Sequence, residues 1–99
     1  MAEIDFLERC YTKNPSMVFR KIADECLLVP ISHQVADLNY LFVLNPVAGR
    51  IWELIDGHNL VRDIKDQLLA EYDANPQEVE QDLVEFIAQL SEIGSIRET

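Results

Sequence analysis

The stretch that decides the fold, residues 40–57, reads YLFVLNPVAGRIWELIDG. Its first part, Leu41–Leu44, is apolar at every position and includes an aromatic and a β-branched residue, which favour extended chain. After Asn45-Pro46 the apolar residues recur at helical spacing, at Val47, Ile51, Trp52 and Ile55. The stretch therefore predicts a short strand that leads directly into an amphipathic helix.

The flanking sequence predicts an α+β domain. Upstream, MVFRKI (17–22) and ECLLVPI (25–31) are strand-like runs joined by a two-residue turn, which with 41–44 gives a three-stranded antiparallel sheet. Downstream, apolar periodicity predicts a second helix after Asn59 and a third from Pro76 to about Ile93. We expect a winged-helix-like domain over residues 18–97, with SIRE (95–98) as a short wing or tail.

The N-terminal residues 1–17 carry a weaker signal. They predict either a tail or one short helical turn through Ile4, Leu7 and Tyr11. Three Asn-Pro dipeptides punctuate the chain, and those at 45–46 and 75–76 suit helix starts, with Asn as the N-cap and Pro in the first turn. The first, at 14–15, precedes an extended run and is expected in a loop.

Composition excludes several classes of protein. The 99 residues carry a formal charge of -10, from 18 acids against 8 bases, and a chain of this length suits one domain. Such a surface repels the phosphates of nucleic acid and anionic lipid. No apolar run approaches the roughly 20 residues that span a bilayer, and the acidic N-terminus is not a signal peptide, so we expect a cytoplasmic protein.

The sequence contains no recognisable catalytic or metal-binding motif. It has no Gly-rich phosphate loop and no nucleophile elbow, and its paired acids lie on polar helix faces. Cys10 and Cys26 are expected to be reduced thiols, and their spacing with His33 and His58 matches no zinc motif. We expect no catalytic residue, no metal and no cofactor.

The strand at 41–44 is the first candidate binding surface. It is apolar on both faces, as though something covers each side, and as the last strand of a meander it has an unpaired edge. No Lys, Pro or bulge protects that edge, so it is open to strand addition, one mode of peptide recognition.

The third predicted helix has an apolar arc wider than a single core contact needs. Its main stripe is centred on Val79, Leu83, Phe86, Leu90 and Ile93, while Ile87, Val84 and Ala88 extend the arc along one flank. The flank either touches a second neighbour within the domain or borders a groove beside the open strand. We expect the two large aromatic residues of the helical stripes, Trp52 and Phe86, to be buried structural residues.

The segment from about Val18 to Arg97 resembles the PqqD family, also called the RiPP recognition element. The motifs that carry the resemblance are VLN at the end of a strand, then IWELIDG, VRDI and DLVEFIAQLSEIG in that order. The resemblance implies a winged-helix-like fold and binding of the leader part of a ribosomally made precursor peptide for a modifying enzyme, often a radical-SAM protein. The segment VPISHQVADLNY lacks the Tyr-Pro-Glu-Gly-like turn of members that serve pyrroloquinoline quinone synthesis.

The resemblance also implies a binding site. By position it selects Leu41, Phe42, Val43 and Leu44 of the strand, with Val84, Ile87 and Ala88 on the third helix. The function expected is that of a non-catalytic peptide-binding adaptor, as a monomer or homodimer. Two alternatives stay open, a winged-helix transcription regulator and a structural oligomer whose edge strand pairs with itself.

Overall fold

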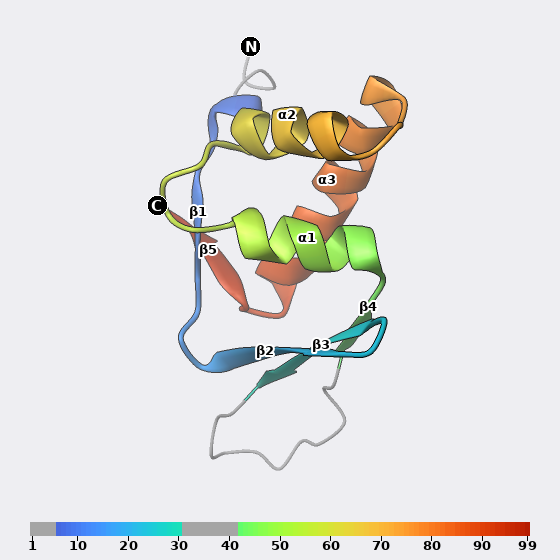
Figure 1. The fold of residues 1–99 in the computed structure, drawn as a ribbon. Coiled ribbons are helices and arrows are strands. Elements are labelled where there is room, and N and C mark those ends of the chain that lie inside the picture. Colours follow the sequence, from blue (N-terminus) through green and yellow to red (C-terminus); the bar gives the residue numbers. More distant parts are fainter. Residues whose placement is uncertain (1–5, 31–41) are drawn as a thin grey trace.

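The computed structural model describes residues 6–30 and 42–99, which form two antiparallel sheets and three helices (Figure 1). The elements in chain order are β1 (Tyr11–Lys13), β2 (Met17–Ile22), β3 (Glu25–Pro30), β4 (Phe42–Leu44), α1 (Pro46–Leu54), α2 (Val61–Glu71), α3 (Pro76–Glu92) and β5 (Ile96–Glu98). The predicted fold class is confirmed, because a three-stranded antiparallel sheet is followed by three helices. Among the described residues, no helix is long and apolar enough to cross a membrane.

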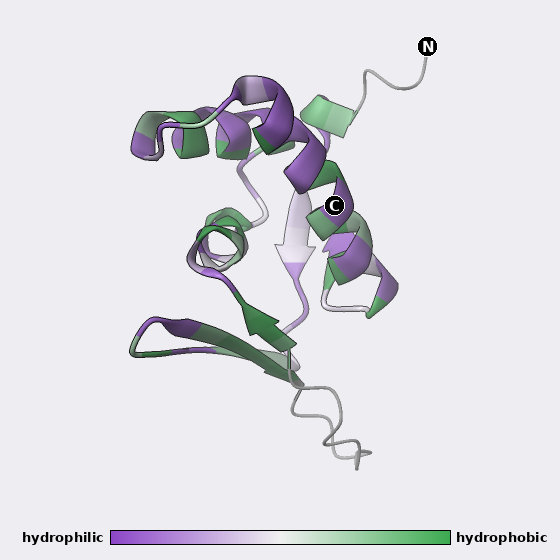
Figure 2. Ribbon diagram, turned by 90° about the vertical axis from the view of Figure 1, so that its right-hand side faces the viewer, coloured by the Kyte–Doolittle hydropathy of each residue, from purple (hydrophilic) through white to green (hydrophobic). Residues whose placement is uncertain are grey.

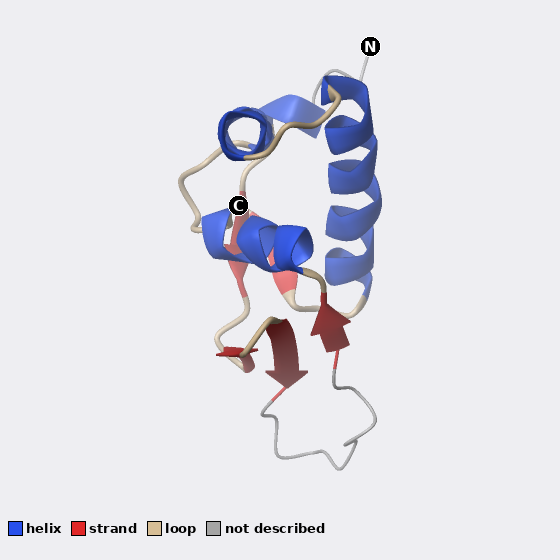
Figure 3. Cartoon of the chain, turned by 45° about the vertical axis from the view of Figure 1, so that its right-hand side comes forward, coloured by secondary structure: helices blue, strands red, loops and turns tan. Residues whose placement is uncertain are grey.

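The three-stranded sheet has the order β2-β3-β4, so β4 is an outer strand (Figure 3). A two-residue turn, Ala23-Asp24, joins β2 to β3, and Ala23 adopts a left-handed φ of 54° there. Such a turn is closed by a hydrogen-bonded pair, here Ile22 and Glu25. Successive residues of an antiparallel strand direct their backbone N–H and C=O groups alternately to one side and to the other. That pair therefore fixes the side to which these groups point at every residue farther along the sheet.

Local signals in the sequence place the helix starts. The Asn45 side chain accepts the Ala48 N–H at 2.8 Å at the start of α1, and Asn75 accepts the Gln77 N–H at 2.8 Å at the start of α3. Both prolines stand in the first turn as predicted. The α2 helix begins differently: the Asp63 carboxylate accepts the Leu60 N–H at 2.9 Å.

The N-terminal segment contributes a strand that the sequence analysis missed. Within the described part of 1–17, residues 6–8 form a single 3-10 turn, and β1 pairs with β5 in a two-stranded sheet. Tyr11 therefore lies in a strand and in the core, not in the predicted helical turn. Three residues with weak periodicity become a strand here because β5 supplies the hydrogen-bonding partner. Asn14 forms part of the loop after β1, as expected, and donates to the Gly94 carbonyl at 2.9 Å.

The core is built from all three helices together with residues of the three-stranded sheet and of β1 and β5. Figure 1 shows α1 between that sheet and α2, with α3 behind α1 and α2 in this view. In Figure 2 the apolar colour fills β4 and alternates with polar colour along the helices, as amphipathic helices require. The buried apolar residues form one cluster: Tyr11, Cys26, Leu28, Leu44, Ile51, Trp52, Ile55, Val61, Ile64, Leu68, Leu83, Ile87, Leu90 and Ile96. Both cysteines are free thiols, as expected.

Candidate functional site

One edge of the outer strand β4 faces away from the sheet, and the polar groups on that edge are backbone N–H and C=O groups. Leu44 pairs with Cys26 and Val43 pairs with Leu27 in the register with β3. Counting from the closing pair of the β2–β3 turn, Leu27 directs its backbone groups toward β2 and Cys26 directs its own toward β4. The N–H and C=O of Leu44 therefore point toward β3, and those of Val43 point to the outer edge. Val43 is the described residue that can offer both groups to an added strand.

The side chains of β4 differ in burial from the prediction. Leu44 is buried against the core and Phe42 is partly buried, whereas Val43 is 62% exposed. The expectation that both faces of this strand are covered is therefore wrong for the described residues, since alternate side chains of a strand point to opposite faces. Leu41, the first residue of the predicted site, lies outside the described residues.

The α3 helix is rotated relative to the prediction. The sequence predicted a buried face formed by Val79, Leu83, Phe86, Leu90 and Ile93. Leu83 and Leu90 are buried as predicted, but the third buried residue of the helix is Ile87, not Val79, Phe86 or Ile93. At about 100° per residue, the observed core direction lies about 45° from the predicted one. The apolar arc is wide enough for either orientation, and packing against α2 and β5 selects the one observed.

This rotation moves two residues between core and surface. Ile87, predicted to line the groove, is only 2% exposed and belongs to the core. Phe86, predicted to be buried, is only partly buried and packs at the margin of the core. Trp52 is buried, as predicted.

A hollow of about 340 Å³ lies between the first turns of α1 and the middle of α3. The residues that line it are Asn45, Val47, Ala48, Ile51, Asp82, Glu85, Phe86 and Gln89. Val84 and Ala88, the other two predicted helix residues, do not line it. Both point away from this face by more than about 100° on the helix, and both are exposed.

A second hollow, of about 120 Å³, continues the first toward the α2–α3 connection. Its lining consists of Val47, Ile51, Leu68, Tyr72, Ala74, Glu78, Val79 and Asp82. Three of these residues, Val47, Ile51 and Asp82, also line the first hollow. The two hollows therefore form one groove, called here the α1–α3 groove, that begins beside the end of β4.

The α1 wall of the groove is fixed to the sheet by an aromatic contact. Trp52 of α1 stacks on Phe19 of β2, with ring centroids 6.5 Å apart and planes at 26°. The Lys13 ammonium lies 5.3 Å from the centroid of the Trp52 ring, a distance typical of a cation–π contact. Burial lowers the pKa of Lys13 below its ordinary value, although Asp56 and Glu53 act in the opposite direction.

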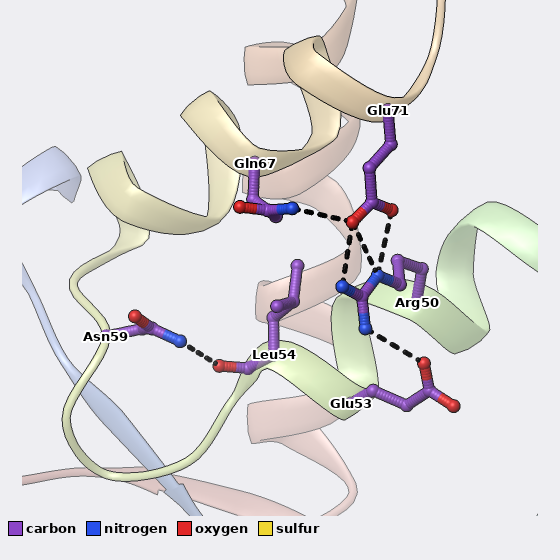
Figure 4. A network of polar contacts seen from close by, with 6 residues as sticks. All are labelled: Arg50, Glu53, Leu54, Asn59, Gln67 and Glu71. Atoms are coloured by element: carbon purple, nitrogen blue, oxygen red, sulfur yellow. Dashed lines mark hydrogen bonds and ion pairs between the residues drawn. The ribbon is translucent and has the colours of Figure 1, made fainter.

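A charged network fixes the same helix to α2 (Figure 4). The Arg50 guanidinium donates to both carboxylate oxygens of Glu71, at 2.7 and 2.8 Å, and to Glu53 at 3.2 Å. Gln67 donates to the same Glu71 carboxylate at 2.7 Å. The hydrogen bonds from Arg50 and Gln67 lower the pKa of Glu71 to about 2, and the same carboxylates raise the pKa of Arg50. The Arg50 guanidinium is thereby held away from the groove.

The groove itself is acidic at its rim. Glu78, Asp82 and Glu85 line it, and no Lys, Arg or His is among the lining residues of either hollow. Within the described part of the chain, Asp82 and Glu85 have neither an ion pair nor a side-chain hydrogen bond. The described residues also contain no group of three or more His, Cys, Asp or Glu side chains placed to hold a metal ion.

The fold and this site define a small α+β domain whose sheet ends in an outer strand beside a helix-lined groove. Comparison with known families gives a match to the model described as "Coenzyme PQQ synthesis protein D (PqqD)" over residues 27–96. The chain belongs to the PqqD family. None of the curated proteins with which the sequence was compared matches it.

One solved structure has the same fold over most of its length. It is described as "TbiB1 in Complex with the TbiA(beta) Leader Peptide" and superposes with a TM-score of 0.71 at 27% sequence identity. The match covers 87% of this chain and 94% of the TbiB1 chain. The structural match therefore covers more of this chain than the family match over residues 27–96 does.

Proposed function

We propose that this protein is a non-catalytic binding protein for an extended peptide, which adds as a strand to the outer edge of β4 and lies along the α1–α3 groove. The observation that carries the proposal is the position of Val43. Its backbone N–H and C=O point out of the sheet at the end of β4 that leads into the groove. An added strand would gain backbone hydrogen bonds there and place alternate side chains in the groove.

The family and the structural relative support a particular class of peptide. The TbiB1 structure is a complex with a leader peptide, and the two chains share their fold over nearly the whole length of TbiB1. The expected ligand is accordingly the leader segment of a ribosomally synthesised precursor. The protein would hold the leader and present the rest of the precursor to a modifying enzyme, for which a radical-SAM protein is our proposal.

The surface chemistry disfavours the transcription-regulator alternative. A DNA-reading helix needs cations, and α3 contains no Lys or Arg between Pro76 and Glu92. The protein as a whole carries a formal charge of -10. The self-pairing alternative predicts a dimer. A second copy would then occupy the β4 edge, and the mass in solution would be that of two chains.

The affinity expected for such a ligand is modest. Each added backbone hydrogen bond contributes about 1 kcal/mol net, and apolar burial of about 400 Å² contributes about 10 kcal/mol. Ordering and association of a free peptide oppose this by about 4–15 kcal/mol. A dissociation constant of about 0.1–50 μM follows from that balance.

The test is an amide-shift titration of the labelled protein with leader segments of short precursor peptides encoded beside its gene. We expect shifts in β4, in the first turn of α1 and along α3. Val43→Pro removes the outward N–H and should weaken binding by about 10-fold or more. Lys21→Pro is the matched control, because by the same alternation the Lys21 backbone groups face the outer edge of β2.

Either of two results would contradict the proposal. One is a leader whose binding shifts only α2 and β1 and leaves β4 silent. The other is equal loss of affinity in Val43→Pro and Lys21→Pro, since the β4 edge would then have no special part in binding. A dimer that dissociates only in Val43→Pro would support the self-pairing alternative instead.

A further inference from the structure

The α1–α3 groove combines an apolar floor with a rim of uncompensated negative charge. The floor consists of Val47, Ile51, Leu68, Val79 and Phe86, which come from all three helices. The rim consists of three carboxylates on one side of α3, those of Glu78, Asp82 and Glu85. A ligand that fills this groove therefore meets two kinds of chemistry within a short distance.

Two cations on the helices that form the groove are already engaged in ion pairs. Arg50, on the α1 wall, has its guanidinium held by Glu71 at 2.7 Å and by Glu53 at 3.2 Å. Lys65 of α2 is paired with Glu80 at 2.9 Å, on another face of α3. Within the described residues nothing neutralises Asp82 or Glu85. A basic group on the ligand would find these carboxylates unpaired.

Helix geometry sets the spacing of the two chemistries. A helix rises about 1.5 Å per residue, so Phe86 of the apolar floor lies about 6 Å from Asp82 along α3 and directly follows Glu85. Residues on the same face of an extended peptide are about 6.6 Å apart. One side chain of an added strand can therefore enter the apolar floor while the next on that face reaches the pair of carboxylates at Asp82 and Glu85.

We propose that the peptide recognised by this protein carries a large apolar residue and, two positions away, a Lys or Arg that binds Asp82 and Glu85. The proposal rests on the proposed function, because it specifies the chemistry of a peptide added to the β4 edge. The apolar residue supplies burial in the groove. The basic residue supplies selectivity, because a neutral or acidic residue at that position leaves the rim unpaired or repels it.

The experiment uses a displayed library of random 12-residue peptides, selected on the intact protein. The wild type should enrich peptides with Lys or Arg two positions from a large apolar residue. The double variant Asp82→Asn/Glu85→Gln should enrich apolar peptides without that basic residue. A matched control, Asp24→Asn/Asp66→Asn, makes the same change in net charge outside the groove and should select as the wild type does.

Binding of one enriched peptide then measures the effect. Replacing its basic residue by glutamine should weaken binding to the wild type by about 5–20-fold, as expected for charge-assisted hydrogen bonds, and to Asp82→Asn/Glu85→Gln by less than about 2-fold. The preference of the wild type should shrink between 50 and 300 mM NaCl, because exposed charges are screened.

The outcomes separate this proposal from the proposed function. Apolar peptides that bind through Val43 without any basic preference would overturn the proposal and leave the peptide-binding function standing. Equal loss of the basic preference in Asp24→Asn/Asp66→Asn would also overturn it, since total charge would then explain the preference. A library that yields no peptide sensitive to Val43→Pro would overturn both.

Discussion

Gly49 of α1 lies directly against Cys26 of β3. A methyl group built on Gly49 would stand 2.5 Å from Sγ and 3.1 Å from Cβ of Cys26, closer than two such atoms can approach. The absence of a side chain at this helical position therefore brings α1 close to the sheet. It also places Asn45 and Val47, at the start of the same helix, beside the end of β4.

Gly49→Ala should destabilise the domain even though alanine is the better helix former. Helix propensity favours the change by about 1 kcal/mol, but overpacking in a close contact costs about 1–3 kcal/mol. We expect a lower free energy of unfolding in denaturant titrations. Adding Cys26→Ala to Gly49→Ala removes the Sγ atom and should recover part of the loss. If Cys26→Ala and Gly49→Ala are simply additive, this contact does not limit the approach of α1.

The ion pair between Arg50 and Glu71 should make stability depend on pH in acid. The pKa of Glu71 is about 2 when folded, against an ordinary value of 4.5, so its stabilisation is complete above about pH 4.5 and is lost as the pH falls toward 2. The melting temperature of wild type should exceed that of Glu71→Gln at pH 7, and the gap should close near pH 2. Glu85→Gln removes a carboxylate without an ion-pair partner and should show no such gap.

Phe86 and Ile87 are adjacent in sequence but should behave differently when truncated. Ile87→Ala removes a side chain that is 2% exposed and should cost about 2–4 kcal/mol of unfolding free energy. Phe86→Ala should cost less than Ile87→Ala and should weaken peptide binding more, because Phe86 lines the groove. Denaturant melts and peptide titrations of both variants check this, and the reverse ranking in both measurements would restore the orientation of α3 predicted from sequence.

Val84 tests the same rotation of α3 from its other side. The side chain is 44% exposed and does not line the groove, so Val84→Glu should leave peptide affinity within about 2-fold. Gln89→Glu, which adds the same charge in the groove, should alter the affinity of a basic or acidic peptide. If Val84→Glu alone strongly weakened binding, the peptide would instead bind on the flank of α3 that carries Val84 and Ala88.

Charge predicts the behaviour toward nucleic acid. With a formal charge of -10, the protein should not retain random duplex DNA in a gel shift at physiological ionic strength. Submicromolar retention that weakens with salt would favour a regulator of transcription over a peptide-binding protein.

Much of the fold follows from local sequence. Asn45-Pro46 and Asn75-Pro76 set the starts of α1 and α3 because capping is decided within one helical turn. The strands β2, β3 and β4 follow from apolar runs bounded by turn residues, and the resemblance in the order of motifs indicates the family. The edge strand of the proposed site was found in this way, and Val43 is its outward-facing residue.

Three features were decided only by tertiary structure. The β1 strand is too short to be recognised alone and exists because β5, more than 80 residues later, pairs with it. The rotation of α3 is not set by its sequence, since its apolar arc permits two orientations and the neighbouring α2 and β5 select one that buries Ile87 and leaves Phe86 at the groove. The requirement for glycine at position 49 arises only in the folded protein, because Cys26 of β3 then lies directly against Gly49. Local hydrogen bonding and periodicity fix which segments are helices and strands, but the face that each one buries depends on contacts between residues far apart in sequence.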